Sequence, residues 1–225
     1  MKIGIICAVG TELTPFLPHI KNCVTSKKAM LTVHEGMVDN VEIAALFCGV
    51  GKTNATIAAQ ILIDTYGASV IINSGTAGGM DTTLQLFDTV ICTEAVCHDV
   101  EDGVLTGVSD WIPSIYFKSD EKLLTAAKKA VKGLGKKAHY GRMVTGDKFI
   151  EDNGRDEINS AFSPLAVDME TASIAHVCYV NNVPYLAVRT ITDTAESSGT
   201  NAFFENCPKA SEISKDIVLE IIKAL

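Results

Sequence analysis

The sequence predicts an α/β protein in which helices cover both faces of a mainly parallel β-sheet. Short, almost continuously apolar runs rich in Ile and Val recur along the chain, as expected of strands that are buried on both faces. Between them lie longer segments whose apolar residues repeat at spacings of three and four, which is typical of helices. The 225 residues are enough for one domain, spanning residues 1–225.

The first predicted strand covers Lys2 to Ala8, and four more follow at residues 41–47, 69–73, 89–93 and 185–191. The clearest predicted helix covers residues 53–66, where small residues such as Ala55 and Ala58 permit close packing on a sheet. Further helices are expected at residues 120–132, 169–181 and 212–225. The polar residues 151–160 indicate a surface loop or a helix start, and residues 194–208 an irregular segment that is a candidate lid.

The composition excludes several classes of ligand and partner. A net charge of -8 argues against nucleic acid, whose binders normally present a basic face. No window approaches the ~20 apolar residues of a membrane span, so we expect a soluble intracellular protein. The seven cysteines form no CxxC pair and the five histidines have no HxxxH spacing, so neither disulfides nor a metal site is predicted.

The stretch FCGVGKT, residues 47–53, ends like a phosphate-binding P-loop. That loop requires a further glycine five residues before the Gly-Lys pair, and this chain has Leu46 there. We therefore expect Lys52 to be a solvated residue that opens a helix.

Two candidate site segments follow predicted strands. Residues 73–79, NSGTAGG, come directly after the strand 69–72, and ligands of open α/β sheets bind at such carboxyl ends. An ordinary tight turn explains this segment equally well. Glu12 follows the first strand and could deprotonate water, although capping of a short helix is the simpler interpretation.

Two further segments bring charged residues next to apolar strands. Asp168 and Glu170 open a predicted helix, where they either cap it or, for Glu170, bind a vicinal diol. Arg189 and Asp193 end an apolar strand, where burying both is costly unless they are paired or functional. A buried structural ion pair and a functional site explain these two residues about equally well.

Taken together, six segments resemble the 5′-methylthioadenosine/S-adenosylhomocysteine nucleosidases of the purine and uridine phosphorylase superfamily. They are, in order, GIICAVGTEL, CGVGKTNA, IINSGTAGGM, TGDKFI, VDMETASIAHV and VRTITD. The similarity runs from Met1 to about Phe203. It implies a three-layer α/β sandwich with a central mixed, largely parallel sheet flanked by helices, a homodimer in the cytoplasm, and no cofactor or metal.

The resemblance also implies hydrolysis of the N-glycosidic bond of 5′-thio-substituted adenosines. Asp193 matches the acid that protonates adenine N7, and Glu12 matches the carboxylate that activates water, with Thr76 and Arg189 helping to hold that water. One carboxylate must be protonated and the other ionised.

The remaining matched positions bind substrate. Glu170 and the Met169 backbone match the groups that hold the ribose hydroxyls, and Phe149 and the Ile150 backbone match those that contact adenine. Val50 and Phe203 match contacts to the 5′ substituent, and Gly78 belongs to the same binding set. On this resemblance, Gly49 and Gly51 let the backbone approach a nucleoside.

Three alternatives stay open. A purine nucleoside phosphorylase is disfavoured because Phe87 stands near the position of a phosphate-binding arginine, and because Glu12 would repel an anion. A hydrolase of another 5′-modified nucleoside, such as a futalosine, is favoured by the divergent segment 100–113, which leaves the preferred 5′ substituent open. A nucleoside-binding protein without turnover is disfavoured, because such a protein does not need Asp193, Glu12 and Glu170 together.

Overall fold

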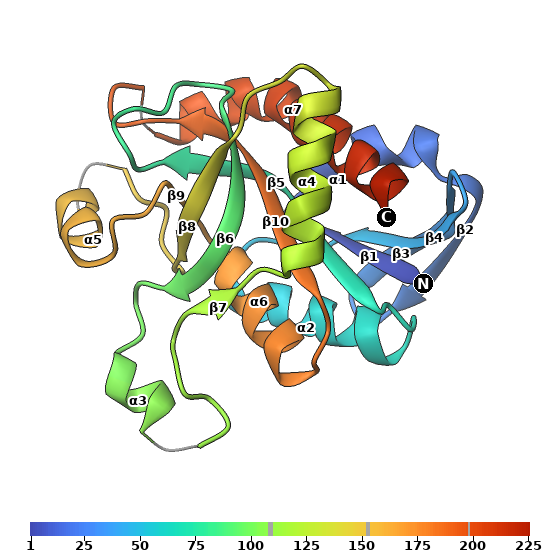
Figure 1. Cartoon of the computed structure of the whole chain (residues 1–225), viewed down its shortest axis with the longest axis horizontal. Helices are drawn as coiled ribbons and strands as arrows, with labels where there is room; N and C mark the ends of the chain where they lie inside the picture. Colours follow the sequence, from blue (N-terminus) through green and yellow to red (C-terminus); the bar gives the residue numbers. More distant parts are fainter. Residues whose placement is uncertain (108–109, 152–153, 198) are drawn as a thin grey trace.

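A mixed β-sheet of ten strands with helices on both sides forms the core of the computed structural model (Figure 1). The structure describes residues 1–107, 110–151, 154–197 and 199–225. The strands are β1 Lys2–Cys7, β2 Lys21–Lys28, β3 Leu31–Val38, β4 Val41–Phe47, β5 Val70–Gly79, β6 Thr89–Cys97, β7 Phe117–Lys118, β8 His139–Thr145, β9 Ala166–Asp168 and β10 Tyr185–Asp193. The helices are α1 Gly10–Leu13, the 3-10 helix η1 Thr14–His19, α2 Lys52–Asp64, α3 Asp102–Thr106, α4 Glu121–Gly133, α5 Arg155–Phe162, α6 Thr171–Val180 and α7 Thr200–Ala224.

The apolar strands are covered on both faces, as predicted. Ile3 and Ile5 of β1 pack with residues of η1, α4 and α7, whereas Ile6 packs on the other face with residues of α2 and α6. Successive side chains of a strand point to opposite faces, so two covered faces require apolar residues at nearly every position. Figure 1 shows α7 along the upper side of the view and α2 and α6 in its lower part.

The sheet is mixed, but the expectation that it is largely parallel is not met. Among the described residues, five strand pairings are parallel and five are antiparallel. In addition, β10 pairs with both β5 and β6, so the order β10-β6-β8-β9-β5 closes on itself like a barrel. A flat three-layer sandwich therefore describes only the part around β1 and β4.

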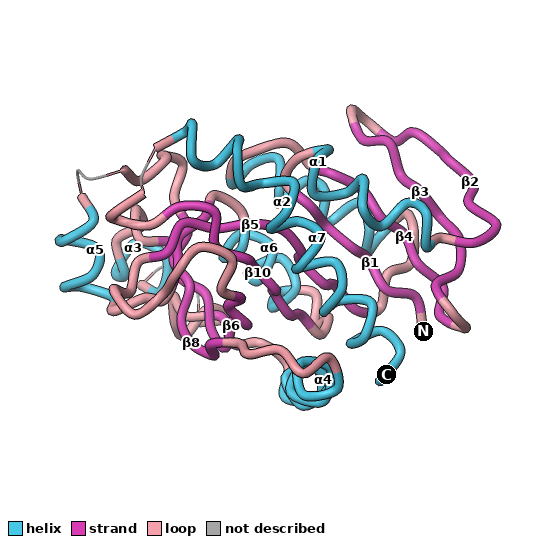
Figure 2. The backbone as a smooth tube through the Cα atoms, turned by 90° about the horizontal axis from the view of Figure 1, so that it is seen from above, coloured by secondary structure: helices cyan, strands magenta, loops and turns pink. Residues whose placement is uncertain are grey.

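Much of the antiparallel pairing comes from a meander of β2, β3 and β4 that the apolar runs did not reveal. Strand β2, KNCVTSKK, is almost entirely exposed at the edge of the sheet. Charged side chains on an edge strand hinder pairing with another chain, and they also remove the apolar signal. In Figure 2 the meander extends at the end of the molecule opposite α3 and α5, and α4 is seen along its axis.

Two segments near the site differ from the predicted structure. Residues 73–79 continue β5 as a buried strand and do not form a turn. Helix α7 begins at Thr200, so the second half of the segment predicted to be irregular is helical despite Pro208 in the helix interior. The predicted lid keeps only residues 194–199 as a loop, and Ser198 lies outside the described residues.

The register of three parallel strands brings the candidate site residues together. Strands β1 and β10 both pair with β5, with Ile6 opposite Asn73 and Asp193 opposite Gly78. The residues that follow β1 and those that end β10 therefore meet over the second half of β5. In the described part of the chain, no helix is long and apolar enough to cross a membrane.

Candidate active site

A single cavity collects the residues that the sequence singled out. Ten of the eleven line it, namely Glu12, Val50, Thr76, Gly78, Phe149, Ile150, Met169, Glu170, Asp193 and Phe203. The exception is Arg189, which is fully buried behind the cavity wall. These residues come from segments spread over most of the chain, so the fold itself assembles the site.

Glu12 lies in the first turn of α1 and is only 2% exposed. Its Oε2 accepts hydrogen bonds from the backbone N–H groups of Ala8 at 2.7 Å and Val9 at 3.2 Å. Its Oε1 accepts from both the N–H and the hydroxyl of Thr76, each at 2.8 Å. Four donors on one buried side chain fit a carboxylate, which only accepts. Glu12 therefore caps a helix and also lines the cavity, so the two interpretations of this residue are compatible.

Glycines of β5 make room for the carboxylates. A Cβ at Gly75 would lie 2.5 Å from Cδ of Glu12 and 2.6 Å from Nη1 of Arg189. A Cβ at Gly78 would lie 2.8 Å from Oδ2 of Asp193. The glycine-rich segment is thus a strand whose backbone is in close contact with acidic side chains of other elements. This close approach explains the glycines, for which the sequence also allowed a tight turn.

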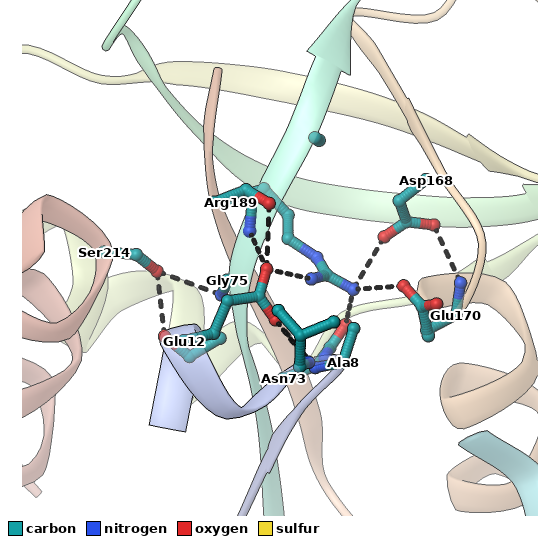
Figure 3. A network of polar contacts seen from close by, with 12 residues as sticks. Ala8, Glu12, Asn73, Gly75, Asp168, Glu170, Arg189 and Ser214 are labelled. Atoms are coloured by element: carbon teal, nitrogen blue, oxygen red, sulfur yellow. Dashed lines mark hydrogen bonds and ion pairs between the residues drawn. The ribbon is translucent and has the colours of Figure 1, made fainter. Parts of the chain in front are cut away.

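Arg189 joins three carboxylates in a buried network (Figure 3). Its Nη2 lies 2.8 Å from Oδ2 of Asp168 and 3.4 Å from Oε2 of Glu170, and its Nη1 lies 4.0 Å from Oε1 of Glu12. Burial alone would lower the pKa of Arg189, but the charges of Asp168, Glu12 and Glu170 hold this pKa above its ordinary value. The guanidinium is therefore permanently charged and links the two sides of the site.

Arg189 and Asp193 are not paired with each other. No ion pair joins them within the described residues. The interpretation of Arg189 and Asp193 as a buried ion pair with each other is therefore wrong. Arg189 pairs with acids from other elements, and Asp193 instead accepts a hydrogen bond from the Thr192 hydroxyl at 2.8 Å. Burial raises the pKa of Asp193, although the Thr192 hydrogen bond and the charge of Arg155 lower it. The net increase favours the protonated acid.

Asp168 has a larger structural part than its position in the sequence suggested. Its Oδ1 accepts from the backbone N–H groups of Glu170 and Thr171 and from the Thr145 hydroxyl, and its Oδ2 contacts Arg189 and the Thr171 hydroxyl. Asp168 thus accepts hydrogen bonds from the N–H groups at the start of α6, whose N-cap residue is Glu170. This leaves the Glu170 carboxylate free to face the cavity, where its Oε1 accepts from the Gly51 N–H at 2.9 Å.

The loop before α2 serves Glu170 and not a phosphate. Gly49 and Gly51 have φ values of 86° and 104°, which side chains disfavour. This conformation aims the Gly51 N–H at Glu170. Lys52 opens α2 as expected, but its Nζ lies 2.7 Å from Asp99 and 3.6 Å from Asp147, so it is an ion-paired residue and not a freely solvated one.

Glu170 makes the stability of the protein depend on pH. Burial raises its pKa from 4.5 to about 7, against the opposing effect of Arg189. The folded protein therefore holds a proton on Glu170 that the unfolded chain releases between these pH values. This contribution to stability is complete below pH 4.5 and is lost as pH rises through about 7. The whole contribution is about 3 kcal/mol.

We expect Glu170→Gln to remove this pH dependence. Urea unfolding of wild type and variant at pH 5 and pH 8 measures it, since the stability difference between the two proteins should change by about 3 kcal/mol. The exposed Glu157 provides the control, because Glu157→Gln should leave the pH dependence unchanged. Parallel stability curves for wild type and Glu170→Gln would contradict the raised pKa.

Aromatic and apolar side chains form the rest of the wall. The rings of Phe149 and Phe203 meet edge to face with centroids 6.4 Å apart, and Val50, 48% exposed, lies at the open side. Phe87 does not line the cavity, and Lys209 Nζ lies 3.8 Å from its ring centroid. Among the described residues, no group of three or more His, Cys, Asp or Glu side chains could hold a metal ion.

Several contributors escaped the sequence analysis. Lys148, Thr192 and Phe204 line the cavity, and the Thr171 hydroxyl accepts a hydrogen bond from Nε of Arg189 at 3.3 Å. Asn73, which belongs to the predicted segment 73–79, accepts from Nη2 of Arg189 at 2.9 Å. Each of the three lining residues directly adjoins a predicted residue, namely Phe149, Asp193 and Phe203, which is the signal that the sequence offered. The hydrogen bonds depend on strand register, which the sequence does not specify.

Comparisons with known proteins agree with this geometry. The model of the phosphorylase superfamily matches residues 2–223. The chain is 34% identical to the 5′-methylthioadenosine/S-adenosylhomocysteine nucleosidase of Staphylococcus carnosus and 36% identical to that of Glaesserella parasuis, covering 99% of this chain and 100% and 98% of those proteins. The nucleosidase of Neisseria meningitidis, solved with methylthio-immucillin-A, superimposes with a TM-score of 0.92 at 29% identity, over 100% of this chain and 99% of the other.

The fold is shared beyond the nucleosidases. Futalosine hydrolase of Helicobacter pylori superimposes with a TM-score of 0.91 at 26% identity, over 100% of this chain and 98% of the other. The matches at 34% and 36% identity, however, cover both partners almost completely. The chain therefore belongs to the 5′-methylthioadenosine/S-adenosylhomocysteine nucleosidase family, within the phosphorylase superfamily.

Proposed function

We propose that the protein hydrolyses the N-glycosidic bond of 5′-methylthioadenosine and S-adenosylhomocysteine, releasing adenine and the 5-thio-substituted ribose. The observation that carries this proposal is one cavity lined by two buried carboxylates in different environments. Burial raises the pKa of Asp193, whereas Glu12 accepts four hydrogen bonds. One fold thus provides an acid whose burial favours the protonated form and a second carboxyl group placed as a hydrogen-bond acceptor.

In this proposal Asp193 donates its proton to adenine N7, so the base leaves as a neutral molecule while positive charge develops on the ribose. Glu12 takes a proton from the water that attacks the anomeric carbon. Thr76 donates hydrogen bonds to Glu12 at 2.8 Å and helps to place this water. Arg189 helps to hold the same water, because its buried Nη1 lies 4.0 Å from Oε1 of Glu12 and has no hydrogen-bond partner among the described residues.

Substrate binding is assigned to the remaining residues. Glu170 and the Met169 backbone hold the ribose hydroxyls, the Phe149 ring stacks on adenine, and the Ile150 backbone contacts the edge of the base. Val50, Gly78 and Phe203 complete the pocket, with Val50 and Phe203 next to the 5′ substituent. Support comes from the position of all these residues in one cavity wall.

We further propose that residues 1–225 act as one cytoplasmic domain, that the reaction uses no cofactor, and that two copies form a homodimer. Exposed apolar side chains in the divergent segment 100–113 support the dimer. Val104 and Trp111 are each 63% exposed, and the Tyr179 hydroxyl donates to the Trp111 carbonyl. Side chains of this size are normally covered when they cluster on a surface.

A futalosine-type hydrolase is the second candidate, because a futalosine hydrolase has the same fold with a TM-score of 0.91. Rates of purine-base release from 5′-methylthioadenosine, S-adenosylhomocysteine and a futalosine, each with and without phosphate, test the assignment. We expect the two thioadenosines to react faster than the futalosine, at rates independent of phosphate. Faster release from the futalosine would reassign the substrate, and formation of a 5-substituted ribose 1-phosphate would reassign the reaction.

A further inference from the structure

Among the described residues, the buried cation Arg155 has only neutral partners. It is the first residue of α5 and is 6% exposed. Its Nε donates to the Glu151 carbonyl at 3.2 Å, and its Nη1 contacts the Gly79 carbonyl and, at 3.4 Å, the Met80 sulfur. No carboxylate among the described residues lies within ion-pair distance, and Nη2 has no hydrogen-bond partner there.

Such an arrangement is unfavourable on its own. A buried guanidinium without a counter-charge is costly, and the first turn of a helix disfavours a positive charge. A neutral side chain of similar size would fill the same space without that cost. The charge of Arg155 therefore calls for an explanation beyond packing.

Arg155 lies behind Asp193. The carbonyl that accepts its Nη1 belongs to Gly79, next to Gly78, and Gly78 pairs with Asp193 across β5 and β10. The Asp193 carboxyl rests directly on Gly78, since a Cβ there would lie 2.8 Å from Oδ2. The guanidinium and the carboxyl group thus occupy neighbouring positions along the same segment of β5.

Other charged groups face the same cavity. Glu12 enters from α1, Glu170 from the start of α6 and Lys148 from the loop after β8. Burial raises the pKa of Asp193, and among the charged side chains of the described residues it is the charge of Arg155 that lowers it. A counter-charge that does not form a contact pair leaves Asp193 free to hold a proton in the resting protein.

We propose that Arg155 is a positioning residue for the acid, whose charge stabilises the carboxylate that Asp193 becomes when its proton passes to the leaving adenine. This inference rests on the proposed hydrolysis. The Asp193 proton forms a bond to N7, the C1′–N9 bond breaks with its electron pair going to adenine, and water adds to C1′ while its proton passes to Glu12. Asp193 stays anionic until solvent returns a proton to it and removes one from Glu12. During that interval Arg155 supplies the compensating charge.

Titration of Asp193 in the free protein tests the inference without requiring turnover. The carboxyl resonance of Asp193 in ¹³C-aspartate-labelled protein is identified by its loss in Asp193→Asn and is followed against pH. Arg155→Gln retains an N–H donor for the Gly79 carbonyl but removes the charge, so the Asp193 midpoint should rise by about one to two pH units. Arg155→Lys retains the charge, and its midpoint should stay close to that of wild type.

Arg142→Met is the matched control, because Arg142 pairs with Glu94 and does not line the cavity. Its Asp193 midpoint should not move. In adenine-release assays, Arg155→Gln should lower kcat roughly tenfold and move the basic limb of its pH profile upward with the midpoint. An unchanged midpoint in Arg155→Gln, or a shift of equal size in Arg155→Lys, would overturn the inference even if wild type hydrolyses its substrate. Absence of wild-type turnover would instead overturn the proposed function, and the titration would still decide whether Arg155 controls Asp193.

Discussion

Replacing Asp193 by asparagine is expected to lower kcat for adenine release by roughly 10²–10⁴, the usual contribution of a general acid. Asparagine has almost the same shape and can still accept from the Thr192 hydroxyl, as Asp193 does at 2.8 Å. It has no acidic proton to give to the base. The loss should therefore appear in kcat and leave KM within a small factor.

The control for this variant is Asp216→Asn. Asp216 forms surface ion pairs with Lys136 and Lys215 and does not line the cavity, so its removal should leave kcat unchanged. Thermal unfolding of both variants shows whether the fold is retained. Near-normal kcat in a folded Asp193→Asn protein would remove Asp193 from the role of acid.

Replacing Arg189 by methionine is expected to destabilise the protein by about 3–5 kcal/mol, the cost of leaving a buried charge without its partner. Glu12, Asp168 and Glu170 would then share a buried region without the cation that now lies between them (Figure 3). Water would screen their mutual repulsion only weakly, because Arg189, which now lies between them, is fully buried. Denaturant unfolding at pH 8, where the carboxylates are most fully ionised, measures this loss.

Arg142→Met again serves as the comparison. Arg142 pairs with Glu94 at 2.7 Å, but both side chains are partly exposed, so the expected loss is below about 1 kcal/mol. A similar small loss for Arg189→Met would mean that the three carboxylates do not depend on the guanidinium.

Strands buried on both faces could be predicted from the sequence because their residues are apolar at nearly every position. Residues 2–7 and 41–47 illustrate this, and the structure has both as strands. Strand β2 could not be predicted, because its polar side chains carry no periodic signal. Closure of the sheet also escaped prediction, since it depends on β10 pairing with both β5 and β6, far apart along the chain.

For the site, the sequence identified the side chains but not their partners. Ten of the eleven predicted residues line the cavity. These residues could be identified because each belongs to a short sequence motif. Local spacing gave no sign that Arg189 would bind Asp168, or that Arg155 would lie behind Asp193. The Arg189 contact arises from strand register, and the position of Arg155 from helix α5, which begins only at Arg155 after a polar segment.

The central claim is that one buried acid and one buried base together direct water onto a purine nucleoside. Incubation with excess 5′-methylthioadenosine in phosphate-free buffer, with quantification of free adenine, tests it most directly. We predict adenine in many-fold excess over protein, together with 5-methylthioribose. Adenine limited to one equivalent or less, or formed only after phosphate is added, would contradict the claim.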